Sequence, residues 1–251
     1  MIELKDISAG YGKNIVLRGV SASFKKGKLT AIVGVNGCGK STLLKAILGI
    51  LPLTGGVISI DGKILGDMKR NEIARKAAYL AQGKNTPDMT VEQMVLHGRF
   101  PHLSYPRRYT ARDREIAGSA MEQAGVAEYA REPLHALSGG MRQNAYIAMA
   151  LAQDTEYILL DEPTTHLDIV HQLGLMRMLR ALADGGKGVL AVMHDLPIAF
   201  EFSDEVLLLH EGHVAIQAAP QAVSRSPFIS RVFGVELTQP QDGKQYHYRW
   251  G

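Results

Sequence analysis

Two glycine-rich segments of this sequence have the composition of phosphate-binding loops. The first, GVNGCGKST at 34–42, has the spacing Gly34-x4-Gly39-Lys40-Ser41, which fits the phosphate-loop pattern. Glycines let the backbone bend so that successive N–H groups point at an anion. Lys40 would reach the outer phosphates of a nucleotide, and the Ser41 hydroxyl would coordinate Mg²⁺. The candidate nucleotide contacts are Gly34, Asn36, Gly37, Cys38, Gly39, Lys40, Ser41 and Thr42.

The context of this segment favours a nucleotide site. An apolar run, LTAIVG at 29–34, precedes it, and a helical pattern, STLLKAILGI at 41–50, follows it. The N-terminus of that helix would add its dipole to the anion site. A glycine-rich turn that fits the pattern by chance is the alternative interpretation. Small-molecule kinases share the loop, so the loop alone does not identify the reaction.

Two carboxylates at the end of another apolar run narrow the choice of reaction. In YILLDEP at 157–163, Asp161 is placed to hold Mg²⁺ and Glu162 to act as general base on a water molecule. Acid pairs at strand ends are common, and alone this pair is only suggestive. A kinase would keep water out of its site, so a base aimed at water favours hydrolysis.

The second glycine-rich segment is LSGGMRQ at 137–143. Ser138, Gly139 and Gly140 precede a helical stretch, MRQNAYIAMALA at 141–152, whose N-terminus could receive an anion. The alternative is a plain N-cap, because Ser before a helix usually has that role. These residues by themselves leave both interpretations open.

The elements that must position these residues predict an α/β protein. Apolar runs at 29–34, 157–161 and 188–193 predict buried strands, which alternate with helices and so indicate a mostly parallel sheet. Segments 2–7 and 57–60 read as further strands. EVLLLHEGHVAIQ at 205–217 reads as a hairpin turning at Glu211 and Gly212, so the sheet is expected to be mixed. A helix over 168–182 would bury Ile169, Leu173, Met176, Leu179 and Leu182.

The chain is expected to form one domain with an insertion. Between 85 and 136, helix formers surround a Pro- and Arg-rich connection, RFPHLSYPRRY. We expect a single domain over 1–251, with a catalytic core at 1–84 and 137–235, an inserted helical subdomain at 85–136 and a polar tail at 236–251.

Composition excludes several classes of protein. The 251 residues are 46% hydrophobic, and a net charge of +3 without a basic block gives no sign of a nucleic-acid partner. The single cysteine, Cys38, excludes an internal disulfide and suits a reducing compartment. The N-terminus does not read as a secretion signal, and no apolar run reaches the roughly 20 residues of a spanning helix. We therefore expect a soluble chain whose membrane role goes through a partner.

Taken together, the motifs resemble those of the ATP-binding cassette ATPases over nearly the whole chain. The phosphate loop, Gln82 after a strand, LSGG at 137–140, the acid pair at 161–162, TTHLD at 164–168 and MHD at 193–195 occur in that family's order and approximate spacing. In that family two cassettes pack head to tail, and the signature of one closes over the γ-phosphate held by the phosphate loop of the other. The resemblance implies a P-loop ATPase that pairs with a second copy of itself and shares two ATP sites.

The resemblance also assigns roles to single residues. Tyr11 matches the aromatic residue that stacks on adenine. Gln82 matches the residue that touches Mg²⁺ and the attacking water, and His194 matches the switch histidine on the γ-phosphate. Asp168 matches the aspartate of a loop that crosses the dimer interface.

The implied reaction is in-line attack of water on the γ-phosphate of ATP. The catalytic residues would be Glu162, His194, Gln82 and Lys40. Mg²⁺ would be held by Ser41, Gln82 and Asp161. The partner cassette would contribute its own Ser138, Gly139, Gly140 and Asp168.

Two residues within the motifs carry separate hypotheses. Position 141 is Met where the family's signature continues LSGGQ, so we predict a working but weaker second half-site. Cys38 reads first as a small filler residue. Because it lies close to a helix N-terminus, its thiol is also expected to have a lowered pKa, with inactivation by maleimide and protection by MgATP.

Segments 98–126 and 167–173, the latter LDIVHQL, resemble the subgroup that imports iron chelates, haem and cobalamin. This resemblance implies two integral-membrane permease subunits as partners, an indirect link to a substrate-binding protein, and a place at the cytoplasmic face of the cell membrane. The alternative is a soluble assembly ATPase, such as that of iron-sulfur cluster machinery. Four arginines read either as a solvated face or as a permease contact: Arg99, Arg107, Arg108 and Arg112.

Overall fold

A six-stranded sheet forms the centre of the chain in the computed structural model, which describes residues 1–82, 86–165, 167–238 and 247–249. The strand order is β10–β9–β3–β8–β7–β6, and all neighbours are parallel except β9 and β10. The predicted mixed sheet is confirmed, and Glu211 and Gly212 both have positive φ in the hairpin turn. The strands are β3 (Leu29–Val33), β6 (Ala77–Leu80), β7 (Tyr157–Asp161), β8 (Gly188–Val192), β9 (Glu205–His210) and β10 (His213–Ala218).

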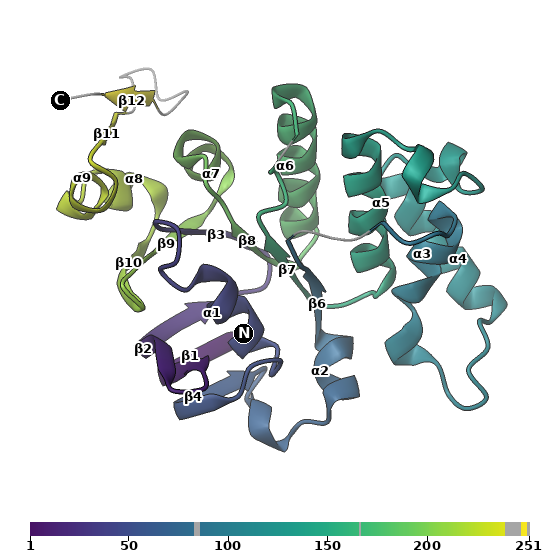
Figure 1. Cartoon of the computed structure of the whole chain (residues 1–251), viewed down its shortest axis with the longest axis horizontal. Coiled ribbons are helices and arrows are strands. Elements are labelled where there is room, and N and C mark those ends of the chain that lie inside the picture. Colours follow the sequence, from purple (N-terminus) through teal and green to yellow (C-terminus); the bar gives the residue numbers. More distant parts are fainter. Residues whose placement is uncertain (83–85, 166, 239–246, 250–251) are drawn as a thin grey trace.

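A second, antiparallel sheet covers one side of the first. Its order is β2–β1–β4–β5, with β1 (Ile2–Tyr11), β2 (Asn14–Phe24), β4 (Leu53–Ile60) and β5 (Lys63–Ile64). Helix α1 (Lys40–Ile47) lies between the two sheets, as Figure 1 shows. Side chains alternate across a strand, so Ile2, Leu4 and Ile7 of β1 are buried in this core. The antiparallel N-terminal part agrees with the prediction, although β2 was not predicted.

Two helices pack against the other face of the central sheet: α6 (Ile169–Asp184) and α7 (Leu196–Phe202). The helix predicted at 168–182 is confirmed, with Asp168 as its N-cap. The prediction that Ile169 is buried is wrong, because this residue in the first turn is 58% exposed. Leu175, Met176 and Leu179 carry the packing instead.

Three helices form the part of the molecule on the right of Figure 1: α3 (Val91–His97), α4 (Ala111–Gln123) and α5 (Gly139–Ala152). They pack on one another, and α5 also contacts β6 of the central sheet. The expected boundary between residues 84 and 85 lies outside the described residues. Short 3-10 helices connect this region: η2 (Phe100–His102), η3 (Ala127–Tyr129) and η4 (Leu134–Ala136).

Arg99, predicted as part of an arginine cluster on the surface, forms a buried ion pair inside this helical region. Arg99 is 6% exposed, and its Nε donates to Asp113 Oδ1 at 2.9 Å while Nη1 donates to the carbonyl of Ala152. Burial opposes ionisation of Asp113, but hydrogen bonds from Thr110 and Arg99 outweigh it and lower its pKa to about 2. Arg99 is therefore a structural residue and forms no part of an exposed cluster.

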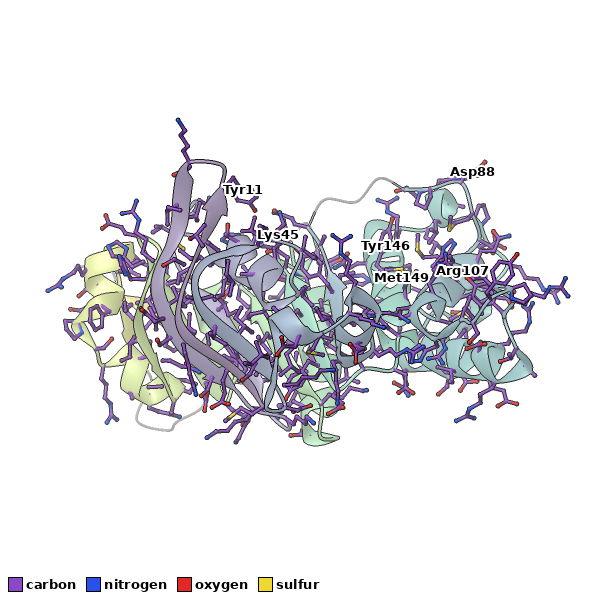
Figure 2. All side chains as sticks on the ribbon, turned by 90° about the horizontal axis from the view of Figure 1, so that it is seen from below. Tyr11, Lys45, Asp88, Arg107, Tyr146 and Met149 are labelled. Carbon is purple, nitrogen blue, oxygen red and sulfur yellow. The ribbon has the colours of Figure 1, made fainter. Side chains whose placement is uncertain are left out.

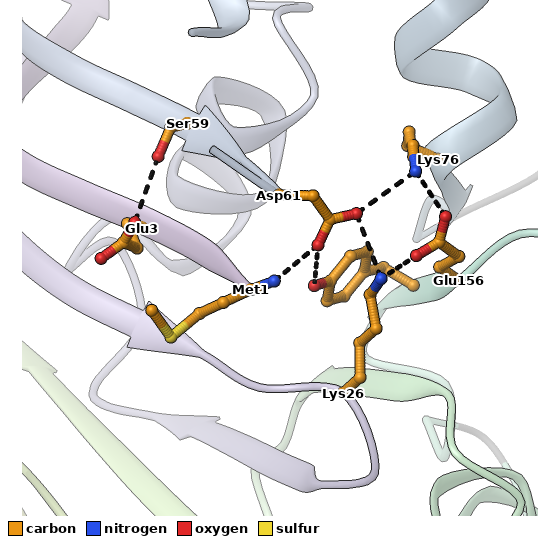
Figure 3. A network of polar contacts seen from close by, with 8 residues as sticks. Met1, Glu3, Lys26, Ser59, Asp61, Lys76 and Glu156 are labelled. Atoms are coloured by element: carbon orange, nitrogen blue, oxygen red, sulfur yellow. Dashed lines mark hydrogen bonds and ion pairs between the residues drawn. The ribbon is translucent and has the colours of Figure 1, made fainter. Parts of the chain in front are cut away.

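A network of charged groups around Asp61 joins the antiparallel sheet to the central one (Figure 3). The Asp61 carboxylate pairs with the Met1 ammonium at 2.6 Å, with Lys26 at 3.1 Å and with Lys76 at 3.3 Å. Glu156, just before β7, pairs with both lysines. Burial alone would raise the pKa of Asp61, but the three cations outweigh this effect and lower the pKa.

The remaining elements complete the two ends of the fold. A 3-10 helix η1 (Leu65–Asp67) and α2 (Arg70–Lys76) lead from β5 into β6. After β10 come α8 (Pro220–Ser224), α9 (Pro227–Phe233) and a small antiparallel pair, β11 (Glu236–Thr238) with β12 (His247–Arg249). Within the part of the chain that the structure describes, no helix is both long enough and apolar enough to cross a membrane.

Candidate functional site

The phosphate loop connects β3 to α1 and is built into the core. Gly34, Gly37 and Gly39 have φ values of 155°, 79° and 110°, which side chains rarely adopt. A Cβ on Gly34 would lie 2.2 Å from the carbonyl oxygen of Leu209, and one on Gly39 would lie 2.9 Å from Leu17. These glycines are therefore required both by conformation and by space.

Lys40 occupies the middle of this loop. The residue is 5% exposed, and its Nζ donates to the carbonyl oxygens of Gly34 at 2.8 Å and Val35 at 3.1 Å. A cavity of about 480 Å³ opens at the loop. It is lined by Val16, Asn36, Gly37, Gly39, Lys40, Ser41, Thr42, Gln82, Glu162 and His194.

Two of the three residues predicted to hold Mg²⁺, Ser41 and Asp161, meet at the first turn of α1, whereas the Gln82 amide donates to Glu162. The Ser41 hydroxyl donates to Asp161 Oδ1 at 2.9 Å, and the Tyr79 hydroxyl donates to Oδ2 at 3.2 Å. Burial and the charge of Asp161 raise the pKa of Tyr79, so the phenol stays a donor. Within the described ranges, no group of three or more His, Cys, Asp or Glu side chains could hold a metal. One hydroxyl and one carboxylate fit an ion that takes its other oxygens from phosphates and water.

Glu162 follows β7 and gathers the other predicted catalytic side chains. His194 Nε2 lies 2.6 Å from Glu162 Oε1, and the Gln82 amide donates to Oε2. The Thr165 hydroxyl also donates to Oε2, at 3.3 Å. Glu162 itself has φ 53°, in the left-handed region that costs a side chain free energy and that is often found at active sites. The structure thus brings together Glu162, Gln82 and His194 from three separate segments.

Tyr11 is the last residue of β1 and lies near helix α1. Its ring is 49% exposed and the Lys45 ammonium lies 5.9 Å from the ring centroid. Figure 2 shows the two side chains close together at the edge of the molecule. Val16 of β2, and not Tyr11, lines the cavity itself.

The second glycine-rich segment opens α5. Ser138 is the N-cap, and its Oγ accepts a hydrogen bond from the Met141 amide at 3.3 Å. Outside its own helix backbone, a Cβ on Gly139 would meet no atom of the described residues within 4 Å. Gly139 lines another cavity, of about 400 Å³, that shares Gln82 and Glu162 with the first. Ser138 lines neither of these two cavities. The structure shows Ser138 as the N-cap of α5, and its role as an anion ligand stays a prediction.

Asp168 caps the neighbouring helix. Its Oδ1 accepts a hydrogen bond from the His171 amide at 2.9 Å, and its side chain is 64% exposed. Val170, next to it, is 75% exposed. The first turn of α6 therefore presents an acid and apolar groups to the outside.

A model of the ABC transporter family matches residues 17–165. The chain belongs to the ABC transporter family. It is 40% identical to the iron(3+)-hydroxamate import ATP-binding protein FhuC of Bacillus subtilis, over 97% of this chain and 92% of that protein. It is 39% identical to the ferric enterobactin transport ATP-binding protein FepC of Escherichia coli, over 92% of this chain and 86% of that protein.

Solved structures of ABC transporters share the fold. A metal-chelate type ABC transporter in an inward-facing conformation superposes with a TM-score of 0.85 at 25% identity, over 99% of this chain and 96% of that one. A dimeric ATP-binding cassette bound to ADP and phosphate superposes with a TM-score of 0.75 at 28% identity, over 88% of this chain and 99% of that one. The predicted family and the P-loop ABC ATPase fold are confirmed.

One prediction about this ABC ATPase site is wrong. Cys38 was expected to have a lowered thiol pKa, but the residue is 5% exposed and burial raises its pKa, with the opposing charge of Lys40 as the smaller effect. The Sγ atom lies 2.7 Å from the Cβ that Gly34 lacks, so the thiol fills space inside the loop. Cys38 is a packing residue.

Two residues near the ABC motifs were missed from the sequence. Tyr79 lies on β6, three residues before Gln82, and its hydroxyl donates to Asp161. A tyrosine in an otherwise apolar strand was the local signal for this contact. Gln143 of α5 donates to the carbonyl oxygen of Pro163 at 3.0 Å and so ties the signature helix to the Glu162 loop. That contact joins residues far apart in the sequence and leaves no local pattern.

Proposed function

We propose that this chain is the ATP-hydrolysing subunit of a membrane importer for an iron chelate, working as a head-to-tail pair of cassettes. Its relatives named above are import or transport ATP-binding proteins for iron(3+)-hydroxamate and ferric enterobactin. These relatives favour the importer over a soluble assembly ATPase. The cargo would be an iron–siderophore complex that never contacts this subunit.

One observation carries the head-to-tail arrangement. The cavity at the phosphate loop is lined by ten residues, and Ser138 and Gly140 of the same chain are not among them. Ser138, Gly139 and Asp168 are all exposed. Two copies related by a two-fold axis would each present the signature surface to the other's phosphate loop. A dimeric cassette is known for a structural relative.

In this proposal the phosphate loop and Lys40 bind the phosphates of ATP. Ser41 and Asp161 would hold Mg²⁺, which would neutralise charge on the phosphates. Lys40 would leave the carbonyl oxygens of Gly34 and Val35 to reach the phosphates, because its ammonium now donates to both.

Glu162 would then accept a proton from the attacking water. In the present geometry its two oxygens are occupied by His194, Gln82 and Thr165. His194 would turn to the γ-phosphate and Gln82 to the water and the metal, which frees one carboxylate oxygen for the base role. The partner subunit's Ser138 would donate to the γ-phosphate at the N-terminus of its α5.

The domain division follows the same proposal. The core would comprise 1–84 and 137–235, and the helical subdomain 85–136 would receive two permease subunits at the cytoplasmic face of the membrane. A substrate-binding protein would act only through those permeases. Packing of α5 on α3 and α4 makes the signature segment the natural link between that subdomain and the ATP site.

The first test is the Glu162→Gln variant. We expect ATP turnover to fall at least about 100-fold, because a general base contributes that much or more. MgATP should convert the variant to a dimer in light scattering. Glu201→Gln, which neutralises an exposed carboxylate on α7, is the matched control and should keep wild-type turnover. A variant that stays monomeric in MgATP would contradict the shared-site proposal.

The importer assignment has its own test. Tagged protein would be recovered from its native cells in a gentle detergent, and co-purifying proteins identified by mass spectrometry. A polytopic membrane protein in near-equal amount is expected. Recovery of soluble partners only, with the membrane fraction empty, would favour the assembly ATPase and leave the ATP site assignments intact.

A further inference from the structure

The motif LDIVHQL at 167–173 places a histidine in the first turn of α6, one turn after Asp168. His171 Nδ1 lies 2.9 Å from both carboxylate oxygens of Asp168. The His171 backbone amide also donates to Oδ1. These contacts hold the Asp168 carboxylate in one orientation even though it is largely exposed.

The other edge of the same imidazole lies against the signature. A Cβ on Gly140 would be 2.6 Å from His171 Cδ2 and 3.0 Å from both Cγ and Nε2. Gly140 has an ordinary helical φ, so the absent side chain is required by space and not by conformation. The ring therefore occupies the place where a side chain at position 140 would lie.

Further contacts join each of these two segments to the loop that follows β7. Gln143 of α5 donates to the carbonyl of Pro163, and Gln172 of α6 donates to the carbonyl of Leu167 at 2.9 Å. The N-terminal ends of α5 and α6 approach each other at Gly140 and His171. The start of α5, the Glu162 loop and the start of α6 thus form one connected unit.

We propose that His171 is a positioning residue that fixes the signature Gly139–Gly140 relative to Asp168, so that both surfaces meet the partner cassette as one preformed unit. The inference rests on the proposed function, because it concerns closure of the pair. His171 does not line the cavity at the phosphate loop of its own chain. Its removal should impair closure while leaving ATP binding to the single cassette intact.

Single substitutions test the position of the signature. For His171→Ala we expect ATP-driven dimerisation, measured in the Glu162→Gln background, to need about tenfold more ATP. Binding of a fluorescent ATP analogue to the monomer should be unchanged. His171→Asn places an amide nitrogen where Nδ1 donates to Asp168 and should restore dimerisation to within about threefold of wild type. Equal dimerisation for His171→Ala and wild type would overturn the proposal.

The sharper test uses the missing Cβ at position 140. Gly140→Ala drives a methyl group into the imidazole, and we expect turnover to fall about tenfold or more. His171→Ala vacates that space, so the double variant should recover to the level of His171→Ala alone. Gly139→Ala is the matched control. Among the described residues its methyl group meets no atom outside its own helix backbone within 4 Å, so His171→Ala should not rescue any defect it causes.

Each outcome separates the two proposals. Gly140→Ala that is active in both backgrounds, or equally inactive in both, would overturn the role of His171 while wild-type ATPase activity remains. Wild-type protein that neither hydrolyses ATP nor dimerises would overturn the proposed function instead. If Gly140→Ala fails to fold, the comparison of His171→Ala with His171→Asn still decides.

Discussion

The two glycine-rich segments of this chain use glycine for different reasons. In the phosphate loop, Gly34, Gly37 and Gly39 adopt left-handed φ, and the loop encloses the buried Lys40. In the signature, Gly139 and Gly140 are helical, and only Gly140 is crowded, by His171. In the proposed function the first segment is an anion site completed by its own core, whereas the second is a surface for contact with another molecule.

This difference teaches how to interpret glycine in a binding motif. A positive φ makes glycine a folding requirement, so substitution should unfold the loop. A helical glycine with open space makes no demand on folding, and its role lies in what approaches it.

Gly34→Ala should destabilise the folded chain by about 3 kcal/mol. Its Cβ would meet the Leu209 carbonyl oxygen at 2.2 Å in addition to the strained φ. Gly139→Ala, whose Cβ has no neighbour within 4 Å among the described residues outside its helix backbone, should leave the free energy of unfolding unchanged or raise it by under about 1 kcal/mol. Urea denaturation of the two variants measures both. Similar losses in the two would show that the segments do not differ in this way.

The Cys38 thiol should report how closed the phosphate loop is. Because the thiol is buried and its pKa is raised, maleimide should label the folded protein about 100-fold more slowly than the urea-unfolded protein. The labelling rate followed by mass spectrometry checks this. Fast labelling without denaturant would mean that the loop opens readily and resembles the signature in exposure.

Tyr79→Phe should weaken Mg²⁺-dependent ATP binding at the phosphate loop without unfolding the loop. Loss of the hydroxyl removes one of the two hydrogen bonds to Asp161 seen within the described residues, so the Mg²⁺ concentration for half-maximal ATP binding should rise about fivefold. Binding of a fluorescent ATP analogue in a Mg²⁺ titration measures it. Tyr157→Phe is the matched control, because its hydroxyl donates to Asp61 at the same distance of 3.2 Å but far from the loop. An equal shift in both variants would refute the specific role.

Met141→Gln should have the smallest effect, on the second segment only. Met141 is partly buried against the helical core, and its backbone amide already donates to the Oγ of the N-cap Ser138. Gln would add a polar group at the partner-facing surface, so we expect ATP turnover to rise by less than about threefold, the scale of one exposed hydrogen bond. Steady-state kinetics at saturating ATP would measure the change. Unchanged turnover would show that position 141 is neutral.

Local patterns predicted most of the fold and the position of the glycine-rich loop at 34–42 between a strand and a helix. Strands and the hairpin at Glu211 were visible because β-branched runs and turn residues are local signals. The burial of Cys38 and of Arg99 was not predictable. Each depends on packing with residues distant in sequence, such as Leu209 beside the loop and Ala152 beside Arg99. The contact between His171 and Gly140 was hidden for the same reason.

The separation of Ser138 from the Lys40 cavity within one chain has a genetic consequence. Under head-to-tail pairing, a chain altered at Lys40 damages the site on its own phosphate loop, and a chain altered at Ser138 damages the site of its neighbour. A mixed pair of these two defective chains places both lesions in one site and leaves the other site whole. Two alleles that each abolish function alone would therefore complement each other when expressed in the same cell.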